Sequence, residues 1–122
     1  HISTIKTEIK DLDVLRRVCE NKKVSCQIAS TGQEVSSRLY SGEAKGVATF
    51  KPEGWRFPVV VDKDGVLKYD NYNGGWGKQQ ELDNLVDEYS AELVRDRLRM
   101  EGMRVVSERR LEDNTLELEF VR

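Results

Sequence analysis

The chain opens with a pattern that changes from alternating to helical and back. Residues 2–10 alternate between an apolar and a polar face, which predicts a first strand with one face in water. Asp11 then stands as an N-cap before residues 12–22, a predicted helix whose apolar stripe is formed by Leu12, Leu15, Val18 and Cys19. Residues 24–28 alternate again and predict a second strand that returns beside the first.

The middle of the chain predicts short strands separated by turns. Residues 29–41 are rich in Ser, Gly, Thr and Gln and predict a loop with at most a weak edge strand. Residues 46–50 predict a strand, and residues 51–56 a turn that holds Pro52 and Gly54. Two further strands, residues 57–61 and 66–69, flank a turn over residues 62–65 and predict a hairpin, in which Pro58 belongs near a strand start.

A long helical pattern follows, and the chain ends in a second hairpin. Residues 78–100 predict a helix whose apolar face is formed by Leu82, Leu85, Val86, Tyr89, Leu93 and Met100. Its first half is acidic and its second half basic, which complements the helix dipole. Gly102 is expected to cap this helix. Residues 104–110 and 115–121 predict the two last strands, with Leu116, Leu118 and Phe120 facing the core and Glu117 and Glu119 facing water.

This order of elements predicts an α+β fold. We expect an antiparallel or mixed sheet with two helices on one face, built on a ferredoxin-like βαββαβ core with extra strands. A chain of 122 residues is expected to form a single domain over residues 1–122.

The charge balance excludes several classes of protein. The chain has 20 Lys and Arg against 22 Asp and Glu, a net charge of −2, which argues against a polyelectrolyte nucleic-acid binder. No apolar run approaches the ~20 residues of a membrane helix, and we expect no membrane span. Without a basic and apolar leader, the protein is expected to stay where it is translated, in the cytoplasm, a plastid stroma or a phage-infected host cytoplasm.

Residues suited to catalysis or metal binding are scarce. The single histidine is His1, a poor place to fix catalytic geometry, so we expect no catalytic residues, no cofactor and no metal. Cys19 and Cys26 lack metal-ligand spacing and are interpreted as small buried thiols, although their separation would also allow a local disulfide.

Residues 69–77 form the least typical stretch of the sequence. They include three aromatic residues and three glycines but only one charged residue, Asp70. Glycines before a helix can present backbone N–H groups to an anion, and an exposed aromatic ring can stack on a base or sugar. The stretch matches neither a Walker loop nor a dinucleotide fingerprint. A purely structural turn, with Tyr72 and Trp76 packed on the sheet edge, is the alternative.

Two segments carry a resemblance to a known family. Residues 1–13 (HISTIKTEIKDLD) and residues 68–77 (KYDNYNGGWG) resemble the opening and the aromatic–glycine segment of the hypothetical chloroplast open reading frame thirty-five family, whose members occur in cyanobacteria, plastids, other bacteria and phages. Residues 89–119 are similar to its last helix and hairpin. The family is a domain of unknown function, so the resemblance implies no reaction. The motif positions that it transfers are His1, Ser3, Lys6, Thr7, Asp70 and Trp76.

These observations favour a non-enzymatic accessory or adaptor protein that docks on a larger assembly. The resemblance implies an AAA-type ATPase as one partner. A small-ligand or nucleotide-binding domain is the first alternative. An RNA or single-stranded DNA module is the second, although no strand has the aromatic-rich pattern that is typical of RNA-binding sheets. A homodimer through Ala91, Val94 and Leu98 also stays open. The candidate binding residues are Asp70, Tyr72, Asn73, Trp76, His1 and Lys6.

Overall fold

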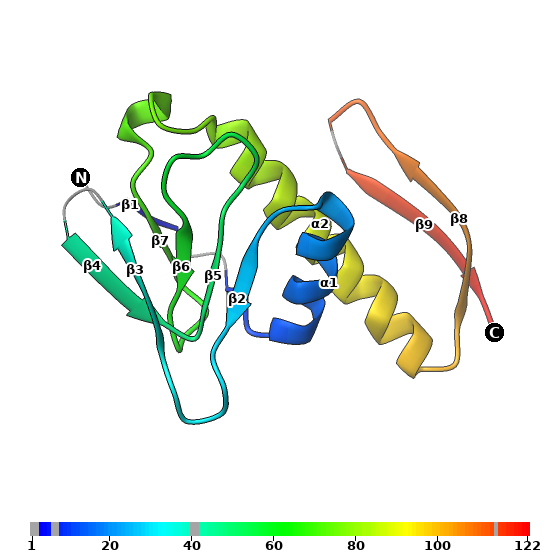
Figure 1. Cartoon of the computed structure of the whole chain (residues 1–122). Coiled ribbons are helices and arrows are strands. Elements are labelled where there is room, and N and C mark those ends of the chain that lie inside the picture. Colours follow the sequence, from blue (N-terminus) through cyan, green and yellow to red (C-terminus); the bar gives the residue numbers. More distant parts are fainter. Residues whose placement is uncertain (1–2, 6–7, 40–41, 114) are drawn as a thin grey trace. The chain divides into compact units, whose positions relative to one another are not determined.

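The computed structural model describes residues 3–5, 8–39, 42–113 and 115–122. It is an α+β structure with two α-helices and antiparallel sheets, as predicted (Figure 1). The chain divides into two compact units, residues 1–89 and residues 90–122. The long helix α2 (Gln79–Met100) begins in the first unit and ends in the second.

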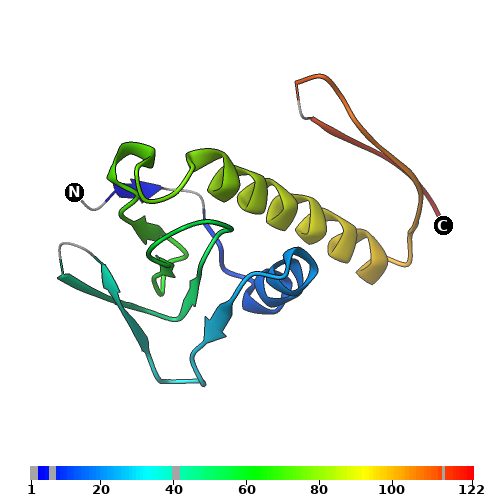
Figure 2. The ribbon, with the colours of Figure 1, turned by 45° about the horizontal axis from the view of Figure 1, so that its top comes forward.

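The first unit is built on a five-stranded antiparallel sheet. Its strands are β1 (Ser3–Ile5), β2 (Cys26–Ile28), β5 (Ala48–Phe50), β6 (Val59–Val61) and β7 (Leu67–Tyr69), in the spatial order β1-β7-β6-β5-β2 (Figure 2). A separate two-stranded sheet joins β3 (Val35–Leu39) to β4 (Gly42–Gly46), and the second unit holds a third sheet. Since the strands are spread over several sheets, the ferredoxin-like arrangement is not confirmed.

Helix α1 (Leu12–Lys22) forms where the sequence predicts it. The Asp11 side chain accepts a hydrogen bond from the Val14 N–H at 3.1 Å, as an N-cap does. Of the predicted apolar stripe, Leu15, Val18 and Cys19 are at most 3% exposed, whereas Leu12 is half-buried and Val14 takes its place in the core. Leu82, Leu85 and Tyr89 of α2 are buried as well, so both helices contribute to the core of this unit.

Three predictions for the first unit need correction. In the predicted strand 2–10, the described residues form strand only over β1; Ile9 is 1% exposed but donates its N–H to the Gly65 carbonyl in a loop contact. Strand β2 does not return beside β1, since it pairs with β5 at the opposite edge of the sheet. The weak edge strand that the prediction allowed within residues 29–41 is β3, but its partner β4 was not predicted, because its sequence is rich in glycine and charge.

The second unit consists of the last part of α2 and the hairpin of β8 (Arg104–Arg110) and β9 (Leu116–Val121). Gly102, at φ +77°, ends α2 as predicted, and the Met103 N–H donates to the Leu98 carbonyl at 2.9 Å. The expected burial is absent, however. Met100 is 82% exposed, Phe120 is 48% exposed, and Leu116 and Leu118 are only half-buried. A two-stranded hairpin is a single layer, so it buries little of the hydrophobic surface of its own side chains.

Candidate functional site

Residues 69–77 change from buried to exposed within four residues. Tyr69, Asp70 and Asn71 are at most 7% exposed, whereas the Tyr72 side chain is 67% exposed. A single 3-10 turn, η1 (Tyr72–Gly74), makes this change. Asp70 holds its start, since the carboxylate accepts a hydrogen bond from the Tyr72 N–H at 3.1 Å. Asp70, predicted as a binding residue, is therefore a buried residue that shapes the turn.

The backbone of η1 is strained. Tyr72, Asn73 and Gly74 have consecutive positive φ angles of 50°, 50° and 96°. The left-handed region costs most residues with a side chain about 1–2 kcal/mol, so Gly74 suits its position, Asn73 is tolerated there, and Tyr72 is strained. Such strain persists only where surrounding contacts over-determine the conformation.

Hydrogen bonds supply those contacts by tying the segment to its neighbours. The Trp76 N–H donates to the Asn71 carbonyl at 2.9 Å, and the Arg56 N–H donates to the Trp76 carbonyl at 2.7 Å. Near the start of α2, the Asn71 side-chain amide donates to Oε1 of Gln79 at 3.1 Å. Trp55 lies beneath, with its indole N–H donating to the Lys78 carbonyl at 2.9 Å. The segment is thus fixed by the start of α2, which directly follows it, and by the turn with Trp55 and Arg56, which is distant in sequence.

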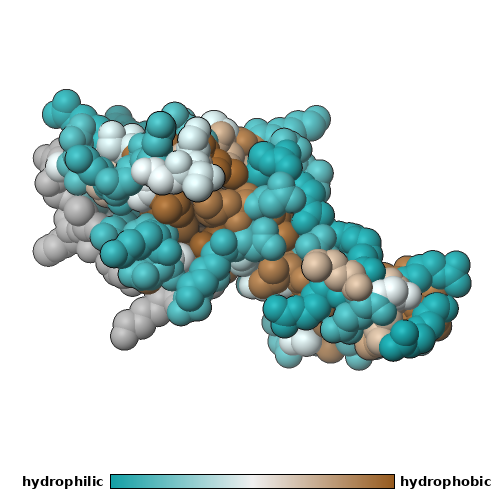
Figure 3. Space-filling model, turned by 90° about the horizontal axis from the view of Figure 1, so that it is seen from below, coloured by the Kyte–Doolittle hydropathy of each residue, from teal (hydrophilic) through white to brown (hydrophobic). Residues whose placement is uncertain are grey.

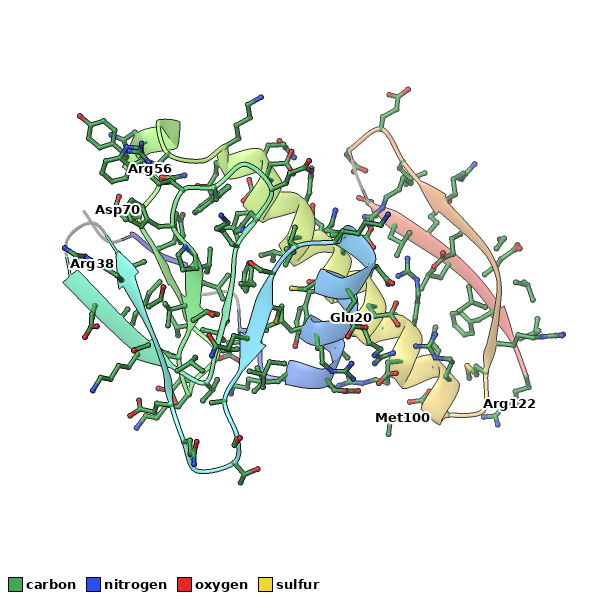
Figure 4. The ribbon with its side chains drawn as sticks, in the orientation of Figure 1. Glu20, Arg38, Arg56, Asp70, Met100 and Arg122 are labelled. Carbon is green, nitrogen blue, oxygen red and sulfur yellow. The ribbon has the colours of Figure 1, made fainter. Side chains whose placement is uncertain are left out.

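An aromatic cluster, formed by Phe57, Tyr72 and Trp76, lies at this surface. The rings of Tyr72 and Trp76 stack with centroids 4.7 Å apart and planes 21° apart. Phe57 meets the Trp76 ring edge-to-face at 5.4 Å. The guanidinium carbon of Arg56 lies 6.0 Å from the centre of the Trp76 ring, at the outer limit of a cation–π contact. Figure 4 labels Arg56 and Asp70 beside η1.

An open pocket of about 700 Å³ adjoins the cluster. It is lined by residues 74–78 and by Glu53, Gly54, Arg56 and Glu81. The lining holds two basic side chains, Arg56 and Lys78, and two acidic ones, Glu53 and Glu81, so it carries no net charge. The pocket can therefore hold polar groups of either sign, and Trp76, the aromatic residue in its lining, supplies an apolar contact.

The structure brings together four of the six predicted site residues. Asp70, Tyr72, Asn73 and Trp76 all belong to this segment, while His1 and Lys6 lie outside the described residues. Sequence reasoning missed Arg56 and Phe57, which reach the cluster from the turn before β6. Their only signal is a turn that carries basic and aromatic residues, and nothing in it indicates a contact about twenty residues away.

Neither a metal-ligand cluster nor a membrane-spanning helix occurs in the part of the chain that the structure describes. No group of three or more His, Cys, Asp or Glu residues there could hold a metal ion. Likewise, none of the described helices is both long and apolar enough to span a membrane.

Comparisons with protein-family models, with curated proteins and with solved structures found nothing that matches this chain. The chemistry of the site therefore has to follow from its own geometry.

Proposed function

We propose that this chain is a non-enzymatic accessory protein that docks on a protein partner through the aromatic cluster and Arg56. The exposed ring of Tyr72 carries the proposal. Tyr72 is 67% exposed and has a left-handed backbone conformation, and its ring stacks on the ring of Trp76. A side chain that only filled space would gain little at such a position.

Two physical arguments support a protein as the partner. Backbone strain gathers at ligand clamps and binding surfaces, because it fixes a side chain where a partner needs it. Tyr, Trp and Arg also dominate the residues that contribute most to protein–protein affinity, since they present large contact area with few rotatable bonds. The cluster and Arg56 combine all three residue types around one anchored turn.

The family resemblance supplies the finer part of the proposal. Because members of that family are known without a reaction, an accessory role suits the resemblance, and an AAA-type ATPase is the partner it suggests. The cytoplasm or a plastid stroma is the compartment that we propose for this assembly. A ferredoxin-like relation among the strands is the finer proposal for the fold.

A site-specific photocrosslinker tests the proposal directly. A benzophenone amino acid replaces Tyr72 in one variant and Asp64, an exposed residue of the β6–β7 turn, in the control variant. Irradiation in an extract of the native source is expected to give a discrete adduct from position 72 and none from position 64. Equal labelling from both positions, or no adduct from position 72, would contradict docking through the aromatic cluster.

Affinity for the captured partner then gives the energetic test. Tyr72→Ala is expected to weaken binding by about tenfold or more, which corresponds to about 1.4 kcal/mol. Because the ring is mostly exposed, the same change should leave the urea-unfolding midpoint nearly unaltered. Asp64→Ala, as the matched control, should leave both the affinity and the midpoint unaltered.

The pocket beside the cluster favours a second candidate, a small ligand with an anionic group. Arg56, Lys78 and the first turn of α2 line it, and a helix start attracts anions. A thermal-shift panel of nucleotides and phosphorylated metabolites tests this candidate, with Lys78→Gln expected to abolish any shift. Oligonucleotide binding, the third hypothesis, requires an affinity that falls steeply with salt and drops with Tyr72→Ala.

A further inference from the structure

The two cysteines lie at the junction between α1 and β2. Helix α1 ends with Lys23 at φ +58°, and there the chain reverses direction. The Val24 N–H donates to the Cys19 carbonyl at 3.0 Å, which directs the next residues back along the last helical turn. Cys26 then begins β2, opposite Phe50 of β5. The local fold thus brings a helical and a strand cysteine to the same place.

The two thiols are free and hydrogen-bonded to each other, but they differ in exposure. Cys19 is fully buried, whereas Cys26 is partly exposed. The hydrogen bond to Cys26, together with burial, raises the pKa of Cys19. The hydrogen bond from Cys19 lowers the pKa of Cys26; burial opposes this, the Arg16 charge assists it and the Glu20 charge opposes it. The accessible thiol is therefore the one that ionises more easily.

We propose that Cys26 and Cys19 form an oxidation site at which a peroxide joins the two thiols in an intramolecular disulfide. A buried thiol at the end of α1 and an accessible thiol at the start of β2 together define the site. The reversal at Lys23, closed by the bond from the Val24 N–H to the Cys19 carbonyl, places the two residues on adjoining elements, as a disulfide between them requires. This inference is independent of the proposed docking function, since it uses neither the aromatic cluster nor the pocket.

The chemistry takes two steps. The Cys26 thiolate attacks one oxygen of hydrogen peroxide, the O–O bond breaks, and the leaving hydroxide takes up a proton to become water, which leaves a sulfenic acid on Cys26. Cys19 then attacks the Cys26 sulfur. Its proton passes to the departing hydroxyl group as a second water, and the S–S bond forms. Two electrons have moved from the two thiols to the peroxide.

Mass spectrometry of the whole chain tests the site. The reduced protein is treated with hydrogen peroxide, alkylated with N-ethylmaleimide in denaturant and digested. We expect the Cys19 and Cys26 peptides to be joined, with the loss of two hydrogen atoms, and dithiothreitol to restore both thiols. Two fully alkylated thiols, after a treatment that oxidises free glutathione, would overturn the proposal. Independent oxidation of each cysteine without a joined peptide would overturn it equally.

Variants separate the two roles. In Cys19→Ser, Cys26 is expected to stop at the sulfenic acid, which dimedone traps, whereas in Cys26→Ser the buried Cys19 should stay reduced. Because Cys19 is a core residue, a folding defect in its variant would obscure this result, and a measurement on the unaltered chain covers that case: iodoacetamide should alkylate Cys26 about tenfold faster than Cys19 in the native state. Equal alkylation rates, or dimedone labelling of Cys19 in Cys26→Ser, would contradict the assignment.

Discussion

The two units differ in how much hydrophobic surface they bury. Among the described residues, every buried hydrophobic side chain except Ala91 belongs to residues 1–89. In residues 90–122, Val94, Val106, Phe120 and Val121 are 44–51% exposed. Figure 3 shows hydrophobic residues at the surface of the molecule among hydrophilic ones. The hydrophobic effect therefore stabilises the first unit far more than the second.

Ion pairs are prominent in the second unit. Glu92 accepts hydrogen bonds from Arg95 at 3.1 Å and from Arg99 at 2.9 Å, and Arg95 also pairs with Glu108 of β8. The Glu92 and Arg95 side chains are only 15% and 19% exposed, so solvent screens them less than a surface pair. The second unit thus combines a regular hairpin with little buried hydrophobic surface, and an ion pair connects its helix to β8.

The largest expected difference comes from matched truncations of a phenylalanine in each unit. Phe50 of β5 is 1% exposed, and Phe50→Ala should lower the free energy of unfolding by about 3–5 kcal/mol, because it leaves a cavity. Phe120 of β9 is 48% exposed, and Phe120→Ala should cost about 1 kcal/mol or less, since little area is lost. Urea unfolding followed by circular dichroism measures both. Similar losses would show that the second unit has a core of its own.

A smaller loss is expected from an added methyl group below the aromatic segment. A Cβ on Gly77 would lie 2.5 Å from the Trp55 ring, so Gly77→Ala must displace a buried indole. The expected cost is about 2 kcal/mol, typical of an overpacked core. Ser90→Ala, at an exposed helical position, is the control and should change the unfolding midpoint little. An unaltered midpoint for Gly77→Ala would mean that the tight packing of the first unit ends before this segment.

Glu92 provides a pH test that addresses the second unit. Burial raises its pKa, but the hydrogen bonds and charges of Arg99 and Arg95 outweigh this and lower it below the ordinary 4.5. Since the folded-state pKa is lowered, the stabilisation is present above 4.5 and is lost as the pH falls through the folded value. We expect about 1 kcal/mol of pH-dependent stability that Glu92→Gln removes.

Hydrogen exchange of the β8 and β9 amides, followed as the pH is lowered in wild type and Glu92→Gln, measures this effect once the intrinsic pH dependence of exchange is subtracted. The control is Glu101→Gln, an exposed position at the end of the same helix. A wild-type profile that coincides with the Glu92→Gln profile would show that the ion pairs of Glu92 do not stabilise this unit.

The sequence predicts the local elements of both units better than their partners. Helix α1 follows from Asp11 and an apolar stripe, and the β6–β7 hairpin from the turn that ends at Gly65, because caps and turns act over a few residues. The edge position of β2 depends instead on long-range packing. The position of β4 depends on long-range packing as well. A Cβ on Gly46 would lie 2.1 Å from the Val61 carbonyl oxygen, and no local pattern predicts this close approach.

The sequence likewise predicts only the local part of the candidate site. Composition alone sets residues 69–77 apart, since a stretch of aromatic residues and glycines without basic residues is unusual beside a charged helix. Composition cannot tell that Asp70 is buried while Tyr72 is exposed, because the chain turns outward at Tyr72 and Asn73 through positive φ angles that no local pattern predicts. Arg56 and Phe57 join only through the tertiary fold.

The smallest expected effects come from the C-terminal ends of the two helices. Both helices end in a residue with left-handed backbone, but this residue is a lysine after α1 and a glycine after α2. At the end of α1, Lys23 has φ +58° and donates its N–H to the Glu20 carbonyl; at the end of α2, Gly102 has φ +77° and donates to the Arg99 carbonyl. Glycine suits this left-handed position, whereas lysine is strained there. Lys23→Gly should therefore stabilise the protein by about 0.5–1 kcal/mol, and Gly102→Ala should destabilise it by a similar amount.

Thermal unfolding of both variants compares the two ends directly. Lys22→Gly, one residue earlier and still helical, is the control for Lys23→Gly and should destabilise by about 1 kcal/mol, because glycine inside a helix loses entropy without relieving strain. If the second unit depends less on the global unfolding transition, Gly102→Ala should alter exchange in β8 before it alters the midpoint. Equal effects on both readouts would show instead that the two units unfold as one.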